Sequence, residues 1–161
     1  HDNTESLATV RRVPNEPGMA AKVFTLLAEA GVNVDMIVQA SASTGTADIS
    51  FTVPGSAAAK VRDVLQEKQD ELGYQSFDID ANVGKVAVVG VGMKTHSGLA
   101  AKFFNALSDE GVNVLMISTS EIRIAALVPL EQLQDAVRAL HTAYGLDAEQ
   151  VEAVVYGGTG R

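Results

Sequence analysis

The stretch GMAAKVFTLLAEAGVNVDMI at residues 18–37 decides the fold, because the chain contains it twice. Residues 98–117 read GLAAKFFNALSDEGVNVLMI, and the two stretches are identical at 12 of their 20 aligned positions. Unrelated segments do not agree to this extent by chance. Two copies are too few for a solenoid, in which each repeat is stabilised by its neighbours. The sequence therefore predicts a tandem duplication of one supersecondary unit.

Both copies predict the same order of elements. Apolar residues at positions i, i+3, i+4 and i+7 indicate a helix after the first strand of each copy, and Gly31 and Gly111 stand where a left-handed residue ends a helix. The expected strands lie at 8–13, 34–39, 48–53 and 76–81 in the first copy and at 86–91, 114–118, 122–128 and 151–156 in the second. This order, βαββαβ twice, is the α+β ferredoxin-like pattern, with antiparallel sheets and helices on one face. We expect one unit over 1–81 and another over 82–161, although a strand within 151–161 could complete the first sheet instead.

The composition excludes several classes of protein. The chain has 161 residues, 47% of them apolar, which suits a globular protein, and it has no cysteine, which rules out disulfide scaffolds and thiolate zinc sites. A formal charge of −8 argues against binding nucleic acid through its phosphates. No run of about 18 apolar residues is present, so we expect no membrane span. The N-terminus has no signal-peptide pattern and no initiator Met, which we interpret as a fragment or trimmed chain of a cytoplasmic protein.

The loops before the two repeated helices are the first candidate site. Each places a glycine, Gly18 or Gly98, in the first helical turn, where intrinsic propensity disfavours glycine. A residue without a side chain lets a ligand approach the backbone N–H groups that a helix start leaves unpaired. We interpret the loops as a site for an anion, either a carboxylate or a phosphate. The alternative is an ordinary helix start, capped by Asn15 or Ser97 and begun by Pro17.

Other chemical motifs are weak. GVGMKT at 90–95 has neither the glycine spacing of a dinucleotide fingerprint nor that of a P-loop. The three histidines are too scattered to suggest a metal site, and no grouping of nucleophile, base and acid is present. We therefore expect no catalytic residue and no metal ligand. Asn33 and Asn113 follow the glycine caps and Gln39 ends a strand, and for all three a turn or edge position is the alternative to ligand contact.

Several stretches resemble aspartate kinase, a family whose regulatory region contains two ACT units. The segments that carry the resemblance are PGMAAKVF (17–24), VNVDMIVQ (32–39), GKV (84–86), GMKTHSG (92–98), ISTSEIRI (117–124) and VYGGTGR (155–161). The first two are similar to the first ACT unit, the next two to the entry of the second unit, and ISTSEIRI is nearly a family signature. The resemblance covers almost the whole chain and points to the regulatory region, or separately made β subunit, of a bacterial aspartokinase inhibited by lysine and threonine.

The resemblance implies a regulator rather than a catalyst. The family transfers a phosphoryl group from ATP to the side chain of aspartate, at the start of the route to lysine, threonine, methionine and diaminopimelate. Its kinase domain, with the ATP and Mg²⁺ sites, is not in this sequence, so we expect no cofactor here. The expected partners are a lysine or threonine effector, a second copy in a homodimer formed through the ACT units, and the kinase domain or α subunit. We expect neither nucleic acid nor membrane as a partner.

The resemblance also implies where the effector binds, which in the family is between ACT units. Backbone N–H groups around Gly18 to Ala20 would hold the α-carboxylate of an amino acid, and Asn15 and Gln39 would hold its ammonium, since a buried unpaired charge is costly. The implied effector-binding residues are Asn15, Pro17, Gly18, Met19, Ala20, Asn33, Val34, Asp35, Gln39, His96, Ser97, Gly98, Leu99, Asn113, Val114, Ile117, Ser118, Thr119 and Ser120.

One stretch departs from the family pattern. Members commonly carry Asp-Lys-Pro-Gly in the first loop, whereas this chain has Asn15-Glu16-Pro17-Gly18. Asn15 brings no charge to an ammonium, and charge-assisted hydrogen bonds are about twice as strong as neutral ones. The sequence therefore predicts weaker effector binding or a different effector. Two further hypotheses stay open: a standalone nucleotide-binding or enzymatic ferredoxin-like domain that uses the loop at 92–98, and a subunit-assembly module with degenerate pockets.

Overall fold

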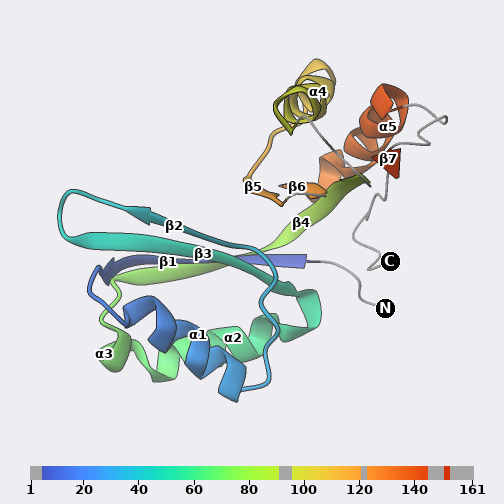
Figure 1. Cartoon of the computed structure of the whole chain (residues 1–161). Helices are drawn as coiled ribbons and strands as arrows, with labels where there is room; N and C mark the ends of the chain where they lie inside the picture. The colour runs from blue at the N-terminus through green and yellow to red at the C-terminus, as the bar shows by residue number, and fades with distance from the viewer. Residues whose placement is uncertain (1–4, 91–95, 121–122, 145–150, 153–161) are drawn as a thin grey trace. The chain divides into compact units, whose positions relative to one another are not determined.

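The computed structural model describes residues 5–90, 96–120, 123–144 and 151–152. The chain divides into two compact units, residues 1–81 and 82–161. Each unit consists of a sheet with its helices on one face (Figure 1). The prediction of two tandem α+β units with antiparallel sheets is confirmed.

The first unit follows the predicted order of elements. In chain order it contains β1 (Glu5–Pro14), α1 (Met19–Glu29), β2 (Ile37–Ser41), β3 (Thr46–Pro54), the 3-10 helix η1 (Gly55–Ala57), α2 (Ala58–Glu67), α3 (Gln69–Leu72) and the beginning of β4 (Ser76–Gly90). Its strands lie in the order β2-β3-β1-β4, and β3 pairs antiparallel with both β1 and β2. The strand β2 therefore forms one edge of this sheet.

The core of the first unit lies on one face of its sheet, because side chains alternate between the two faces along each strand. Along β3 the residues Ala47, Ile49, Phe51 and Val53 are buried and share one face of the sheet. The helices α1 and α2 cover this face (Figure 1), and their buried residues repeat at helical spacing. The helix residues of this core are Val23, Leu27, Val61, Leu65 and Leu72.

The second unit repeats this arrangement. Its elements are the remainder of β4, α4 (His96–Asp109), β5 (Met116–Thr119), β6 (Arg123–Pro129), the 3-10 helix η2 (Leu130–Gln132), α5 (Leu133–Tyr144) and β7 (Val151–Glu152). β6 pairs antiparallel with β4 and β5, and β7 pairs with the end of β4. Its core includes Phe103, Leu107, Ile124, Ala136 and Leu140.

The predicted strand at 34–39 is wrong in its bounds, because β2 begins only at Ile37. Thr52 of β3 is fully buried, and its Oγ1 accepts the N–H of Met36 at 2.9 Å. The N–H of Asp35 bonds to the carbonyl of Thr52, and the N–H of Thr52 bonds to the carbonyl of Met36. The Thr52 side chain thus accepts the N–H of Met36 in place of a backbone carbonyl. The regular ladder of hydrogen bonds between β2 and β3 starts one residue later, at Ile37.

The predicted strands at 76–81 and 86–91 form one continuous strand, β4. Gly84 does not interrupt it, because a glycine without positive φ can remain extended, and its pairing with Val128 is regular. Of the predicted last strand at 151–156, only Val151 and Glu152 belong to the described residues, and they pair with Gly90 and Val89. The left-handed helix ends are confirmed, since Gly31 has φ 82° and Gly111 has φ 71°.

Candidate functional site

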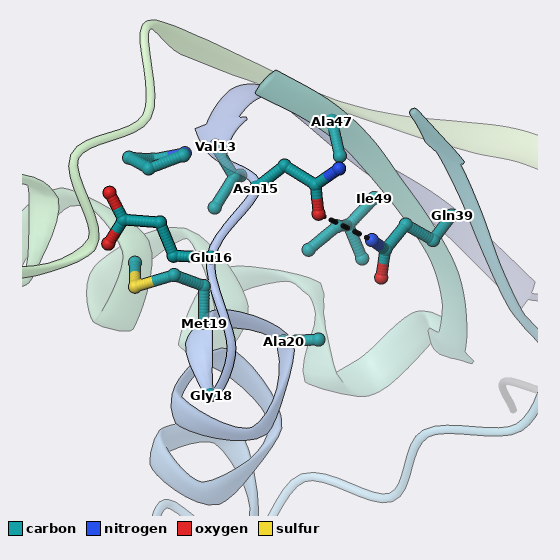
Figure 2. A pocket seen from close by; sticks show the side chains of 10 residues that line it. Val13, Asn15, Glu16, Gly18, Met19, Ala20, Gln39, Ala47 and Ile49 are labelled. Atoms are coloured by element: carbon teal, nitrogen blue, oxygen red, sulfur yellow. Dashed lines mark hydrogen bonds between the residues drawn. The ribbon is translucent and has the colours of Figure 1, made fainter. Parts of the chain in front are cut away.

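A pocket in the first unit lies between the loop after β1, the start of α1 and the hairpin of β2 and β3 (Figure 2). Its volume of about 200 Å³ is below the range of roughly 300–1,000 Å³ that drug-sized ligands occupy, so it suits a guest as small as a free amino acid. It is lined by Val13, Pro14, Asn15, Glu16, Gly18, Met19, Ala20, Gln39, Ala47 and Ile49.

A β-bulge turns the end of β1 toward this pocket. The register of β1 against β3 shifts between Val10 and Val13, so that Arg11 and Arg12 stand opposite Asp48 alone. Arg12 has a left-handed φ of 61°, and its N–H donates to Oδ1 of Asp48 at 3.0 Å. A bulge adds one residue to a strand and bends it. The carboxylate of Asp48 therefore fixes the bend that leads the chain into the pocket loop.

The hairpin of β2 and β3 supplies the opposite wall. Its register places Gln39 beside Ile49 and Ser41 beside Ala47, on the face of the sheet that the helices cover. The N–H of Asn15 donates to the carbonyl of Gly45 in the hairpin turn at 3.0 Å. The loop is thus tied to the hairpin by its backbone.

Two amide side chains form a short hydrogen-bonded chain along this wall. Gln39 Nε2 donates to Oδ1 of Asn15 at 3.4 Å, and Asn15 Nδ2 donates to Oγ of Ser41 at 3.2 Å. The oxygen of the Gln39 amide points away from Asn15, toward the side of the pocket where α1 begins (Figure 2). The oxygen of Asn15 already accepts from Gln39 but has a second lone pair, so the prediction that Asn15 accepts an ammonium stays a prediction.

The start of α1 supplies hydrogen-bond donors to the pocket. Gly18 is the N-cap, with φ 90° and no side-chain cap, so the alternative interpretation of Asn15 as a capping residue is wrong. The N–H of Met19 bonds to the carbonyl of Glu16, and the first α-helical bond runs from the N–H of Lys22 to the carbonyl of Gly18. By helix geometry the N–H groups of residues 20 and 21 have no acceptor inside the helix. Apart from the neighbours of Gly18 in the chain, nothing lies within 4 Å of a Cβ built on it, and Gly18, Met19 and Ala20 line the pocket, so the start of the helix borders open space.

The pocket brings together five of the predicted residues, which are Asn15, Gly18, Met19, Ala20 and Gln39. Pro17 is not among the lining residues. Asn33, Val34 and Asp35 follow the other end of α1, about 16 Å away along a helix of 11 residues. The side chain of Val34 packs on the core of the first unit.

Sequence reasoning missed half of the lining, namely Val13, Pro14, Glu16, Ala47 and Ile49, together with Ser41 behind it. Glu16 stood in the quoted loop and could have been found there. The apolar members carry no signal of their own, because only the register of β3 against β1 and β2 brings them to the loop.

Comparison with known families decides the kind of fold to which this pocket belongs. A family model described as ACT domain matches residues 11–69 and 86–144, which is most of both units. The chain belongs to the ACT domain family. The resemblance stated from the sequence segments is thereby confirmed at the level of the fold.

The relatives specify the kind of ACT protein. The aspartokinase of Corynebacterium glutamicum is 46% identical over 162 residues, which cover 99% of this chain and 38% of that protein. The chain thus spans about two fifths of the length of the curated relatives that it matches. A crystal structure of aspartokinase alpha and beta subunits contains a chain that is 43% identical, with a TM-score of 0.83, covering 90% of this chain and 95% of that chain.

The regulatory subunit of aspartate kinase from Thermus thermophilus, in its ligand-free form, is 35% identical, with a TM-score of 0.82. The match covers 89% of this chain and 95% of that subunit. The two ACT units therefore correspond to the regulatory region of an aspartokinase.

The second ACT unit uses several of its predicted site residues for its own structure. The carbonyl of Leu99 accepts the hydroxyl of Tyr144 at 2.9 Å, and the ammonium of Lys102 lies 4.8 Å from the centre of the Tyr144 ring. The side chain of Gln132 accepts the N–H of Asn113 at 2.8 Å and donates to the carbonyl of Gly111 at 3.0 Å.

The remaining predicted residues of this unit have varied surroundings. The side chain of Val114 packs on the core, Ile117 is 48% exposed, and the N–H of Ser120 bonds to the carbonyl of Arg123. Ser118 is half-buried and Thr119 is exposed at the end of β5. Residues 92–95 and the side chains of His96 and Ser97 lie outside the described part of the chain, while Gly98 belongs to α4.

Electrostatic shifts in the described residues lie outside the pocket. A hydrogen bond of 2.8 Å to the carboxylate of Asp78 raises the pKa of Arg11, which links β1 to β4. Burial raises the pKa of Tyr74, and burial raises the pKa of Tyr144 to about 12. Within the described ranges no group of three or more His, Cys, Asp or Glu side chains is placed to hold a metal ion. No described helix is long and apolar enough to cross a membrane.

Proposed function

We propose that the first ACT unit binds a free amino acid, lysine or threonine, and that this binding regulates aspartate kinase activity. The observation that carries the proposal is the pairing of two groups across one small pocket. Unpaired backbone N–H groups lie at the start of α1, and the free amide oxygen of Gln39 lies on the facing wall. A zwitterion needs a donor set for its carboxylate and an acceptor for its ammonium, and this pocket offers both.

The carboxylate is assigned to the helix start. The N-terminus of an α-helix carries about half a positive charge and presents N–H groups to an anion. Gly18, Met19 and Ala20 line the pocket, and we therefore assign the carboxylate to the N–H groups of Ala20 and Ala21. An ammonium has donors only, so it pairs with Oε1 of Gln39, whose Nε2 is already turned toward Asn15.

Regulation requires that the effector discriminate between two states of the enzyme. Its influence on the kinase cannot exceed the difference between its affinities for the two states. The proposal places the phosphorylation of aspartate, with ATP and Mg²⁺, on a catalytic domain or α subunit that works with this chain in the cytoplasm. The similarity to the regulatory subunit from Thermus thermophilus and to the alpha and beta subunit structure supports this division of roles.

The proposal includes a homodimer formed through the ACT units. In the first unit β2 is an edge strand, with Ile37 52% exposed and Val38 41% exposed. In the second unit Leu115 and Ile117, beside and on β5, are 44% and 48% exposed. Exposed apolar edge strands have unpaired backbone groups and readily pair with another chain. Sedimentation of the 161-residue chain is expected to give a dimer, and a monomer at high concentration would contradict this part.

Calorimetric titration of the 161-residue chain with L-lysine, L-threonine and ATP tests the proposed function. We expect at least one amino acid to bind and ATP not to bind. Gln39→Ala should weaken amino-acid binding by about tenfold, since a hydrogen bond to a charged group is lost. Gln66→Ala, at an exposed position on α2, is the matched control and should bind as the wild type does.

Three results would contradict the proposal. Binding of ATP without an amino acid would favour a nucleotide-binding domain. Binding of nothing, with a normal dimer, would favour an assembly module. Equal affinity of the wild type and Gln39→Ala would place the effector elsewhere.

A further inference from the structure

We propose that Asp48 is a positioning residue for the pocket of the first unit, because it holds the β-bulge that decides which residues of β1 face the pocket. The inference rests on the proposed function, since its test is the binding of an amino acid. Asp48 is exposed and is not among the ten residues that line the pocket. Its effect on a ligand therefore passes through the backbone that it holds.

The bulge reverses the alternation of side chains at the end of β1. Val10 and Val13 are both buried in the core of the first unit, although they are three residues apart. In a regular strand Arg12 would share the face of Val10, and Val13 would lie on the other face. With the bulge, Val13 pairs with Ala47, and both residues line the pocket (Figure 2). Arg12 is exposed and lies outside the lining.

Arg12 adopts a backbone conformation that is unfavourable for its residue type. Its φ of 61° lies in the left-handed region, which is disfavoured about fivefold to thirtyfold for residues other than glycine. Oδ1 of Asp48, on the strand opposite the bulge, accepts the N–H of Arg12 at 3.0 Å. A hydrogen bond to an ionised acceptor is stronger than one to a neutral acceptor. The carboxylate of Asp48 therefore favours the conformation that the Cβ of Arg12 disfavours.

The other residue of the bulge, Arg11, is held from the side of β4. The carbonyl of Arg11 accepts the N–H of Gln75 at 2.9 Å, and its guanidinium pairs with the carboxylate of Asp78 at 2.8 Å. Both groups of this ion pair are exposed, so we expect it to contribute little. Asp78 carries the same charge as Asp48 beside the same bulge, but its partner is Arg11 rather than Arg12. It is therefore the matched control for Asp48.

Loss of the Asp48 carboxylate should weaken binding without abolishing it. Arg12 then leaves the left-handed region for part of the time, and the pocket is complete only in the remaining fraction of molecules. The apparent affinity falls in proportion to that fraction, so we expect Asp48→Ala to bind about threefold to tenfold more weakly. Asp48→Asn keeps an acceptor oxygen on a side chain of the same length and should bind within about twofold of the wild type.

A double-mutant cycle between positions 12 and 48 tests the inference in the 161-residue chain. Calorimetry with L-lysine and with L-threonine is done at a temperature at which thermal unfolding shows every variant to be folded. Arg12→Gly should bind about as the wild type does, because glycine adopts a left-handed φ without steric cost. In the Arg12→Gly background, Asp48→Ala should change the affinity by less than about twofold. Asp78→Asn should also stay within about twofold of the wild type.

A second variant approaches the same bulge from its other partner and leaves Asp48 in place. A β-branched residue tolerates a positive φ poorly, so Arg12→Val should bind about threefold to tenfold more weakly. This variant decides the question if Asp48→Ala proves to be unfolded. A purely structural role would lower the thermal midpoints of these variants and leave the affinities of the folded proteins equal.

The outcomes separate the two proposals. The role of Asp48 is overturned, while the amino-acid site stands, if Asp48→Ala or Arg12→Val binds as the wild type does. It is also overturned if Asp48→Asn is as weak as Asp48→Ala, or if Asp48→Ala costs as much affinity in the Arg12→Gly background as in the wild type. If neither amino acid binds to the wild type, both the role of Asp48 and the proposed function are overturned.

Discussion

The two ACT units begin their first helices in different ways. In the second unit the hydroxyl of Tyr144, at the end of α5, holds the carbonyl of Leu99 in the first turn of α4. In the first unit the tyrosine hydroxyl, that of Tyr74, bonds to the carbonyl of Leu65 at the end of α2. The start of α1 has instead a bare Gly18 and an open pocket. Duplication thus kept the backbone, while the side chains tied one helix start to α5 and left a pocket beside the other.

The segments after these helices differ as well. Gln132 of η2 bonds to both Gly111 and Asn113 in the second unit. Pro129 and Pro54 precede the two 3-10 helices, so the residue equivalent to Gln132 is Ala57, which has no polar side chain. In the first unit a different side chain holds the segment after the helix, since Oγ1 of Thr52 accepts the N–H of Met36.

The largest expected effect on stability among these substitutions concerns the contact between Gly84 of β4 and Leu133 of α5. Gly84 pairs with Val128 as Ser6 pairs with Val53, so glycine in the second unit replaces serine in the first. A Cβ on Gly84 would lie 2.8 Å from a methyl group of Leu133. Gly84→Ala should lower the free energy of unfolding by about 1–3 kcal/mol through overpacking. Native-state hydrogen exchange should show that amide protection falls in the second unit.

Two further variants control this prediction. Ala81→Val, an exposed position on the same strand, should be nearly neutral. In a Leu133→Ala background, which already costs about 2–5 kcal/mol, Gly84→Ala should cost nothing more. An unchanged penalty in that background would show that the close approach to Leu133 is not the cause.

The next effect concerns the helix start of the first unit. Gly18→Ala should lower the free energy of unfolding by about 1–2 kcal/mol, because an L-residue at φ 90° is strained although no atom lies near its Cβ. Gly55→Ala, in η1 at a position without positive φ, is the control and should be neutral or stabilising. Urea unfolding of the three proteins measures the difference. Equal stability would mean that Gly18 does not adopt the left-handed conformation.

Substitutions at Gln132 and at its equivalent Ala57 test how the segment after the first helix of each unit is held. Gln132→Ala should cost about 1 kcal/mol, because two partly exposed hydrogen bonds to Gly111 and Asn113 are lost. Ala57→Gln should have a small effect of either sign in the first unit. Native-state hydrogen exchange at the N–H of Asn113 is the measurement. Unchanged protection of that N–H in Gln132→Ala would contradict the assigned role.

The last effect is the pH dependence of stability from Tyr144, which appears only above about pH 10. Burial raises the pKa of its hydroxyl to about 12 from the ordinary value of 10.0. This group contributes a constant free energy of unfolding below pH 10, and the contribution falls between about pH 10 and 12, because the unfolded chain loses the proton first. Tyr144→Phe should remove this dependence and cost about 1 kcal/mol at pH 7. Phenolate absorbance against pH reports it, and a Tyr144 that ionises at 10 would contradict the burial argument.

The sequence was sufficient for the parts of the fold that depend on local pattern. The repeat, the helix stripes and the left-handed Gly31 and Gly111 all follow from residue spacing and glycine chemistry. The start of β2 did not, because a single buried hydroxyl on Thr52, in another strand, decides it.

The pocket was predictable along the loop itself and, through the family resemblance, at Gln39 of β2. Gly18 and Ala20 could be named because a helix start has known unpaired donors. Ile49 and Ser41 could not be named, since their place depends on a strand register that the bulge at Arg12 shifts by one residue.

The most direct test of the account is an NMR titration of the 15N-labelled 161-residue chain with L-lysine and L-threonine. If unpaired N–H groups at the start of α1 hold the carboxylate of an amino acid, the largest shifts should occur at the backbone amides of Ala20 and Ala21 and at the side-chain amide of Gln39. Saturable binding that leaves these three signals unmoved would contradict it.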